Sequence, residues 1–164
     1  GELARIFLQG SLGIAPGILL ILMAAGVKHI IATGGVMDTI IFNAAGVISE
    51  MSPMAAVGMV YMLILAFNFF IGSASAKAFI LMPIIAPLAD ILGIKRQMAV
   101  LAFQFGDGFS NVLYPTNAVL LICLGFTVVS YPKWMRWTLK LQLIVFAITL
   151  AFLVLGLLIG YGPV

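Results

Sequence analysis

Charge is what this sequence lacks most clearly. Only 8% of its 164 residues are Asp, Glu, Lys or Arg, whereas 64% are hydrophobic. A soluble domain carries about 25% charged residues, and a chain so poor in charge could not cover its surface with polar groups. The composition therefore excludes an ordinary soluble domain. It indicates an all-α integral membrane protein with roughly four to six membrane-embedded segments of about 20 residues each.

Histidine and cysteine are almost absent, and catalytic motifs are absent altogether. One residue of each type allows neither an internal disulfide nor a metal site with recognisable ligand spacing. There is no phosphate-binding loop, no nucleophile elbow and no pair of carboxylates at catalytic spacing, so we do not expect an enzyme. The net charge of +3 is divided among loops without a basic stripe, which excludes nucleic acid as a partner. We expect no cofactor, and leave open only a bound sodium ion.

Long apolar runs fill the rest of the chain, and a lipid bilayer is the expected surroundings. Residues 1–34 are expected to form a first transmembrane helix and exit loop, with Pro16 as a candidate kink. Residues 35–52 are short for a span and mix polar with apolar side chains, which favours an interfacial arm helix. Residues 131–164 begin with tryptophans among cations, typical of an interface, and are expected to form the final transmembrane helix.

Two apolar arms within residues 53–94 meet at a tip of small residues. The tip reads Gly72-Ser-Ala-Ser-Ala76 and is followed by Lys77. Because Lys77 is the only charge there, we expect the tip to stop inside the membrane, which makes the segment a re-entrant helical hairpin. A helix that begins at such a tip has a partially positive N-terminus, where carboxylates can bind. The alternative is that the small residues only permit a tight turn.

A second break interrupts the apolar run over residues 95–130. The stretch Phe105-Gly-Asp-Gly-Phe-Ser-Asn-Val-Leu-Tyr-Pro-Thr-Asn117 contains glycines, a proline and several polar side chains. Backbone that leaves a helix at membrane depth must be buried in protein or line a cavity. Discontinuous helices of this kind are typical ion and substrate sites of secondary transporters. We therefore predict a discontinuous transmembrane helix with a site at the break.

The two breaks supply the candidate site residues. Hydroxyl, amide and ammonium groups near helix starts suit a carboxylate substrate, and side-chain oxygens beside unwound backbone suit a coupling sodium ion or proton. The substrate-binding candidates are Asn68, Ser73, Ser75, Lys77, Pro115, Thr116 and Asn117, and the ion-coupling candidates are Asp107, Ser110 and Asn111. Purely structural roles stay open. Asp107 or Ser110 could serve solely to cap a half-helix, and Lys77 could serve solely as the ion-pair partner of Asp107 or Asp90.

Several motifs together resemble the YfcC family of bacterial membrane carriers, which is grouped with the anaerobic four-carbon dicarboxylate carriers. They are Gly34-Gly-Val-Met-Asp-Thr-Ile40, Asn68-Phe-Phe-Ile-Gly-Ser-Ala-Ser-Ala-Lys-Ala78, Met82-Pro-Ile-Ile-Ala-Pro-Leu-Ala-Asp90, Arg96-Gln97, Val100-Leu-Ala-Phe-Gln-Phe-Gly-Asp-Gly-Phe-Ser-Asn111, Pro115-Thr116 and Pro132-Lys-Trp-Met-Arg-Trp137. The likeness covers nearly the whole chain but only the C-terminal part of such a carrier. The tip departs from the pattern of many relatives, because Lys77 changes the charge beside it.

The wider group resembled is the ion transporter superfamily, and that likeness implies an architecture. It implies two inverted repeats, each with a re-entrant hairpin and a discontinuous helix, in an elevator carrier that is usually a homodimer. This chain would be the second repeat, and the N-terminal half of the same carrier would be its partner. The implied location is the bacterial inner (cytoplasmic) membrane, with several passes. In this arrangement Ser73 and Ser75 would lie at the hairpin tip.

The expected function is secondary active transport of a small carboxylate-bearing metabolite, such as an amino acid or a dicarboxylate. Coupling to sodium, coupling to protons and substrate exchange all remain open. The family is often labelled as basic amino acid antiporters, yet a lysine near the site would repel a cationic side chain and suit a carboxylate. The alternative is a non-transporting membrane subunit whose helix breaks serve packing with partner chains.

Overall fold

The computed structural model describes residues 2–163, apart from the side chains of 13–21, 24, 25, 27, 28, 31, 32, 37 and 38. This part of the chain is helical and contains no strand. The elements are α1 (Glu2–Thr33), α2 (Val36–Ser49), α3 (Pro53–Phe70), α4 (Ala74–Ile91), α5 (Arg96–Gly108), the 3₁₀ turn η1 (Phe109–Val112), α6 (Ala118–Gly125) and α7 (Tyr131–Leu158). The side chain of Pro16, the candidate kink, lies outside the described residues.

Glycine and proline mark several of the helix boundaries. Gly35 and Gly93 have φ angles of 64° and 66°, which residues with a Cβ rarely adopt. They turn the chain between α1 and α2 and between α4 and α5. Pro53 occupies the first turn of α3, where its missing N–H leaves no helical hydrogen bond unmade. Each of these boundaries is thus specified by the local sequence.

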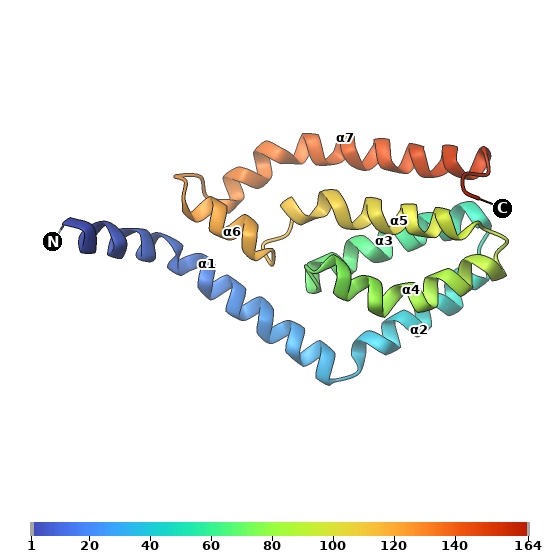
Figure 1. Cartoon of the computed structure of the whole chain (residues 1–164), viewed down its shortest axis with the longest axis horizontal. Helices are drawn as coiled ribbons and strands as arrows, with labels where there is room; N and C mark the ends of the chain where they lie inside the picture. Colours follow the sequence, from blue (N-terminus) through green and yellow to red (C-terminus); the bar gives the residue numbers. More distant parts are fainter. Residues whose placement is uncertain (1, 164) are drawn as a thin grey trace.

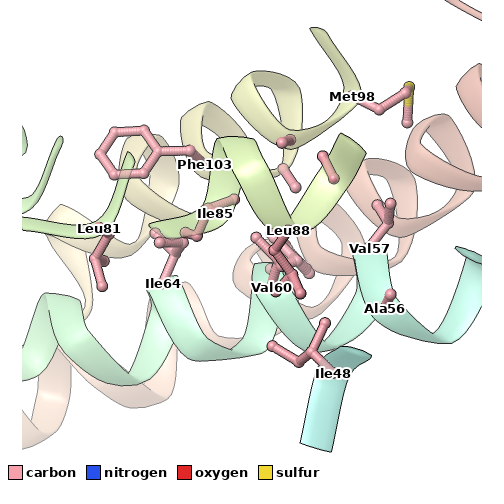
Figure 2. Packing of buried hydrophobic residues seen from close by; sticks show 14 of the residues in the cluster. Ile48, Ala56, Val57, Val60, Ile64, Leu81, Ile85, Leu88, Met98 and Phe103 are labelled. Atoms are coloured by element: carbon pink, nitrogen blue, oxygen red, sulfur yellow. The ribbon is translucent and has the colours of Figure 1, made fainter. Parts of the chain in front are cut away.

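Helix α5 lies at the centre of the packed region, against α3, α4 and α7 (Figure 1). Helix α2 packs beneath α3 and α4, while α1 runs past α6. The core side chains come from several helices, as Figure 2 shows for Ile48, Val60, Ile64, Ile85 and Phe103. The core therefore fixes α5, and the break that follows it, against both arms of the hairpin.

Gly106 lies at a close approach between α5 and α3. A Cβ added to Gly106 would lie 2.8 Å from Ile64 Cβ and 3.1 Å from the carbonyl oxygen of Tyr61. Real Cβ atoms essentially never lie within 3.0 Å of such an atom, and a contact of 3.1 Å is tighter than nine in ten real Cβ contacts. The absent side chain of Gly106 thus lets α5 lie directly on α3, one turn before the break.

Three helices in the described part of the chain are long and apolar enough to cross a membrane. They are Pro53–Phe70, Ala74–Ile91 and Tyr131–Leu158. Large apolar side chains such as Phe42 and Phe79 are 79% and 83% exposed, which is costly in water but not in lipid. An all-helical chain with such helices is an integral membrane protein, as the composition predicts.

Candidate functional site

The tip of the α3–α4 pair lies beside the irregular segment that follows α5 (Figure 1). Residues 71–73 leave the helix between α3 and α4, and the helical path is lost again over η1 and residues 113–117. The second break begins slightly later than expected, because Asp107 and Gly108 still belong to α5. Two breaks from distant parts of the sequence therefore meet in one place.

Asn68 links the two breaks through its side-chain amide. Its Nδ2 donates to Ser110 Oγ and, at 3.4 Å, to the carbonyl oxygen of Asp107. Its Oδ1 accepts from Nζ of Lys77. Because Asn68 is only 3% exposed and lies in the last turn of α3, the network is held next to the non-helical residues 71–73.

Lys77 and Asp107 form a buried ion pair across the two breaks. The ammonium of Lys77 is fully buried, and the carboxyl side chain of Asp107 is 11% exposed. Apart from this contact, Asp107 Oδ1 has no hydrogen-bond partner in the described structure. Among the side chains that the structure describes, these two are the buried charges. Of the two partners that the sequence left open for Lys77, the structure selects Asp107, while Asp90 pairs with Arg96 at the surface.

Ser110, Asn111 and Asn117 complete the polar cluster, which we define as Asn68, Lys77, Asp107, Ser110, Asn111 and Asn117. Asn111 Nδ2 donates to the Asp107 carbonyl at 2.9 Å, and Asn117 Nδ2 donates to Asn111 Oδ1 at 3.3 Å. Ser110 Oγ donates to the Gly106 carbonyl at 2.8 Å. The side chains thus hydrogen-bond the carbonyls that the end of α5 leaves free.

The other candidate residues lie near the polar cluster but outside its hydrogen bonds. Ser73 is exposed and caps α4, since its Oγ accepts from Ala76 N at 3.4 Å. Ser75 is exposed in the first turn of α4. Pro115 and Thr116 are half-buried in the turn before α6. Among residues 2–163, no side-chain hydrogen bond joins these four to the polar cluster, although the backbone N–H of Lys77 donates to the Ser73 carbonyl at 3.1 Å. Their predicted role in binding stays a prediction.

Aromatic donors stabilise the second break, and sequence reasoning missed two of them. Tyr114 donates its hydroxyl to the Leu65 carbonyl at 2.9 Å, which ties the break to α3. Tyr131 and Trp134 donate to the carbonyls of Leu113 and Val112 at 2.7 and 3.0 Å. The segment that begins at residue 131 is also the one expected at a membrane interface. The donor groups of Tyr131 and Trp134 occupy carbonyls that the unwound backbone leaves without helical partners.

Gln142 is a further polar residue that the sequence analysis did not select. It is 7% exposed on α7, and its Oε1 has no hydrogen-bond partner in the described structure. The sequence does contain a signal for Gln142, because a polar amide inside an otherwise apolar span is costly and therefore usually has a function. One turn earlier on α7, the hydroxyl of Thr138 has a partner, because it donates to the Trp134 carbonyl at 3.0 Å.

The donor set of the polar cluster is oxygen and nitrogen from amides, a hydroxyl, a carboxylate and an ammonium. No group of three His, Cys, Asp or Glu residues capable of holding a metal ion exists among the described residues. The cluster can therefore bind polar or charged groups by hydrogen bonds and by charge. The fixed cation and the nearby starts of α4 and α6 suit a carboxylate.

Comparison with known proteins matches residues 2–158 to the family model described as the C4-dicarboxylate anaerobic carrier, DcuC. A protein of Escherichia coli K12, named "Putative basic amino acid antiporter YfcC", is 36% identical over 97% of this chain and 32% of its own length. An uncharacterized protein of Haemophilus influenzae is 27% identical over 85% of this chain and 27% of its own length. The chain thus spans about a third of the curated relatives it matches. No solved structure matches it.

Proposed function

The chain belongs to the C4-dicarboxylate anaerobic carrier family, and from this premise we propose that it is one repeat of a secondary active transporter. The cargo is a small carboxylate-bearing metabolite such as a dicarboxylate or an amino acid. Transport is driven by sodium, by protons or by exchange. Family membership points to a carrier and away from an enzyme.

The observation that carries this proposal is the buried ion pair between the two breaks. Lys77 lies in the first turn of the apolar helix α4, and Asp107 lies in the last turn of α5. Ionisable groups at membrane depth usually mark ion or substrate pathways. Asn68 joins them to Ser110 of the unwound segment. Polar groups, broken helices and an apolar scaffold together are what a midplane binding site needs.

The carboxylate is proposed to bind between the starts of α4 and α6. Ser73 and Ser75 flank the N-terminus of α4, and Pro115 and Thr116 precede that of α6, where partial positive charge favours an anion. The ammonium of Lys77 also lies nearby, paired with the carboxylate of Asp107. Dicarboxylates and amino acids both carry a carboxylate, so this recognition suits either class. A cationic side chain on the cargo would have to point away from Lys77.

The assembly proposed for the intact carrier follows from the same family. The chain would be the second of two inverted repeats, and α3–α4 would form a re-entrant hairpin that moves with the broken helix α5–α6. The N-terminal half would supply a matching hairpin and break, and two carriers would form a homodimer. Helix α2 would lie at the membrane interface of the bacterial inner membrane. The chain's length, about a third of its relatives, leaves room for such a partner half.

Replacing Asn111 tests the function. Asn111→Ala in the full-length carrier removes the amide that donates to the Asp107 carbonyl and should abolish uptake of radiolabelled carboxylates into proteoliposomes. Asn43→Ala is the matched control, since Asn43 is exposed on α2. Both variants should reach the membrane in wild-type amounts. Normal uptake by Asn111→Ala would overturn the site, and a wild-type protein inactive on all carboxylates would favour a packing subunit instead.

A further inference from the structure

The ammonium of Lys77 lies among side-chain oxygens of the polar cluster. The two side-chain oxygens directed at it are Asn68 Oδ1 and Asp107 Oδ1. Amide and carboxylate oxygens are the ligands that hard cations such as sodium and calcium take from proteins. The side chain of Lys77 is fully buried, so its charge is balanced by these protein groups and not by water.

Several other oxygens of the polar cluster already accept hydrogen bonds from protein donors. Ser110 Oγ accepts from Asn68 Nδ2, and Asn111 Oδ1 accepts from Asn117 Nδ2. The Asp107 carbonyl accepts from Asn111 Nδ2. A sodium ion would have to displace several of these hydrogen bonds and would also lie close to a buried positive charge. In surroundings of low polarity that repulsion is only weakly screened.

We propose that Lys77 is a built-in substitute for a coupling sodium ion, so this repeat binds no sodium ion of its own. This deepens the proposed function and rests on it. The ion pair leaves the polar cluster electrically neutral, because one ammonium faces one carboxylate. A neutral cluster can remain at membrane depth without an ion from solution, which an isolated Asp107 could not do.

The proposal makes a direct prediction for the cluster without its lysine. Lys77→Ala leaves Asp107 buried with no positive partner and frees two oxygens together with the volume of the lysine side chain. A sodium ion with its water should then fill the space. The substitution should therefore create a sodium dependence that the wild-type repeat does not have.

The experiment measures the thermal unfolding of the full-length carrier in sodium chloride and in choline chloride at equal ionic strength. Lys77→Ala should melt lower than wild type in choline and should recover saturably as sodium is added. The double variant Lys77→Ala/Asp107→Asn lacks the carboxylate and should show no such recovery. Arg96→Ala removes a cation from the exposed pair with Asp90 and should respond to sodium as wild type does.

Each outcome decides the proposal. Any sodium site in the other half of the carrier contributes equally to all variants, so the decisive quantity is the difference from wild type. A sodium response of Lys77→Ala equal to that of wild type, or one retained by the double variant, would overturn the inference. If Lys77→Ala stays folded through purification only in sodium chloride, this result also supports the inference. If the variant unfolds equally in sodium chloride and in choline chloride, the inference is contradicted. Because no substrate is present, this result is independent of whether carboxylate uptake is observed.

Discussion

A methyl group added at Gly106 should separate α5 from α3 at the point where the site is positioned. The added Cβ would lie 2.8 Å from both Cβ and Cγ2 of Ile64 and 3.1 Å from the carbonyl oxygen of Tyr61. These atoms belong to the backbone or stand next to it, so no flexible side-chain end can move aside. Gly106→Ala must therefore shift α5 as a whole.

The loss of stability is best measured as the difference in the free energy of unfolding between alanine variants of two neighbouring glycines. Gly108, also in α5, has no atom within 4 Å of an added Cβ. Both changes gain the helix propensity of alanine, about 1 kcal/mol, but only Gly106→Ala suffers overpacking, which typically costs about 1–3 kcal/mol. The variants should therefore differ by about 1–3 kcal/mol in the free energy of unfolding, with Gly106→Ala the less stable.

Thermal or denaturant unfolding of the full-length carrier in detergent measures this difference. We expect Gly106→Ala to melt below Gly108→Ala, with a Tm shift per kcal/mol smaller than the roughly 2–4 °C of a 150–250-residue domain, because the full-length carrier is longer. Uptake should fall as well, because Ser110 donates to the Gly106 carbonyl. Equal melting temperatures for the two variants would refute the close approach of α5 to α3.

Two further substitutions test the polar contacts around the breaks. Asn68→Ala removes the amide oxygen that faces Lys77 and should lower the free energy of unfolding by about 3 kcal/mol, because a buried charge loses a partner. Chemical unfolding measures this loss. A loss no larger than that of Asn43→Ala would contradict the prediction. Tyr114→Phe removes the hydroxyl that donates to the Leu65 carbonyl and should lower the free energy of unfolding by about 1 kcal/mol, measured in the same way. An unchanged stability would show that this hydrogen bond does not stabilise the second break.

The sequence was informative wherever polar residues interrupt apolar runs. Such interruptions are costly in a membrane, so each one requires a structural reason. This logic located the break before Lys77, at residues 71–73, and the second break, which begins after Gly108. It also limited the partners of Lys77 to two aspartates, because a buried charge needs an opposite one. The choice between them required the structure, in which Arg96 pairs with Asp90.

The rest depended on which side chains meet in three dimensions. Asn68 is an ordinary asparagine near a helix end in the sequence, and only the packing of α5 on α3 makes it the link between the breaks. Tyr131 and Trp134 follow a general rule for interfacial aromatics, yet their donors reach the unwound carbonyls. Gln142 was overlooked because a single polar residue hardly changes the hydropathy of a long span.

The most direct test of the account is substrate binding to the intact carrier. Thermal shifts would be recorded for wild type and for Asn111→Ala, each with and without sodium. The ligands are four-carbon dicarboxylates, amino acids, and analogues of both in which an amide replaces the carboxylate. The account predicts a saturable shift with at least one carboxylate, which is absent for its amide analogue and absent in Asn111→Ala. No shift with any carboxylate, or an equal shift in Asn111→Ala, would contradict the claim that the two breaks form a carboxylate site.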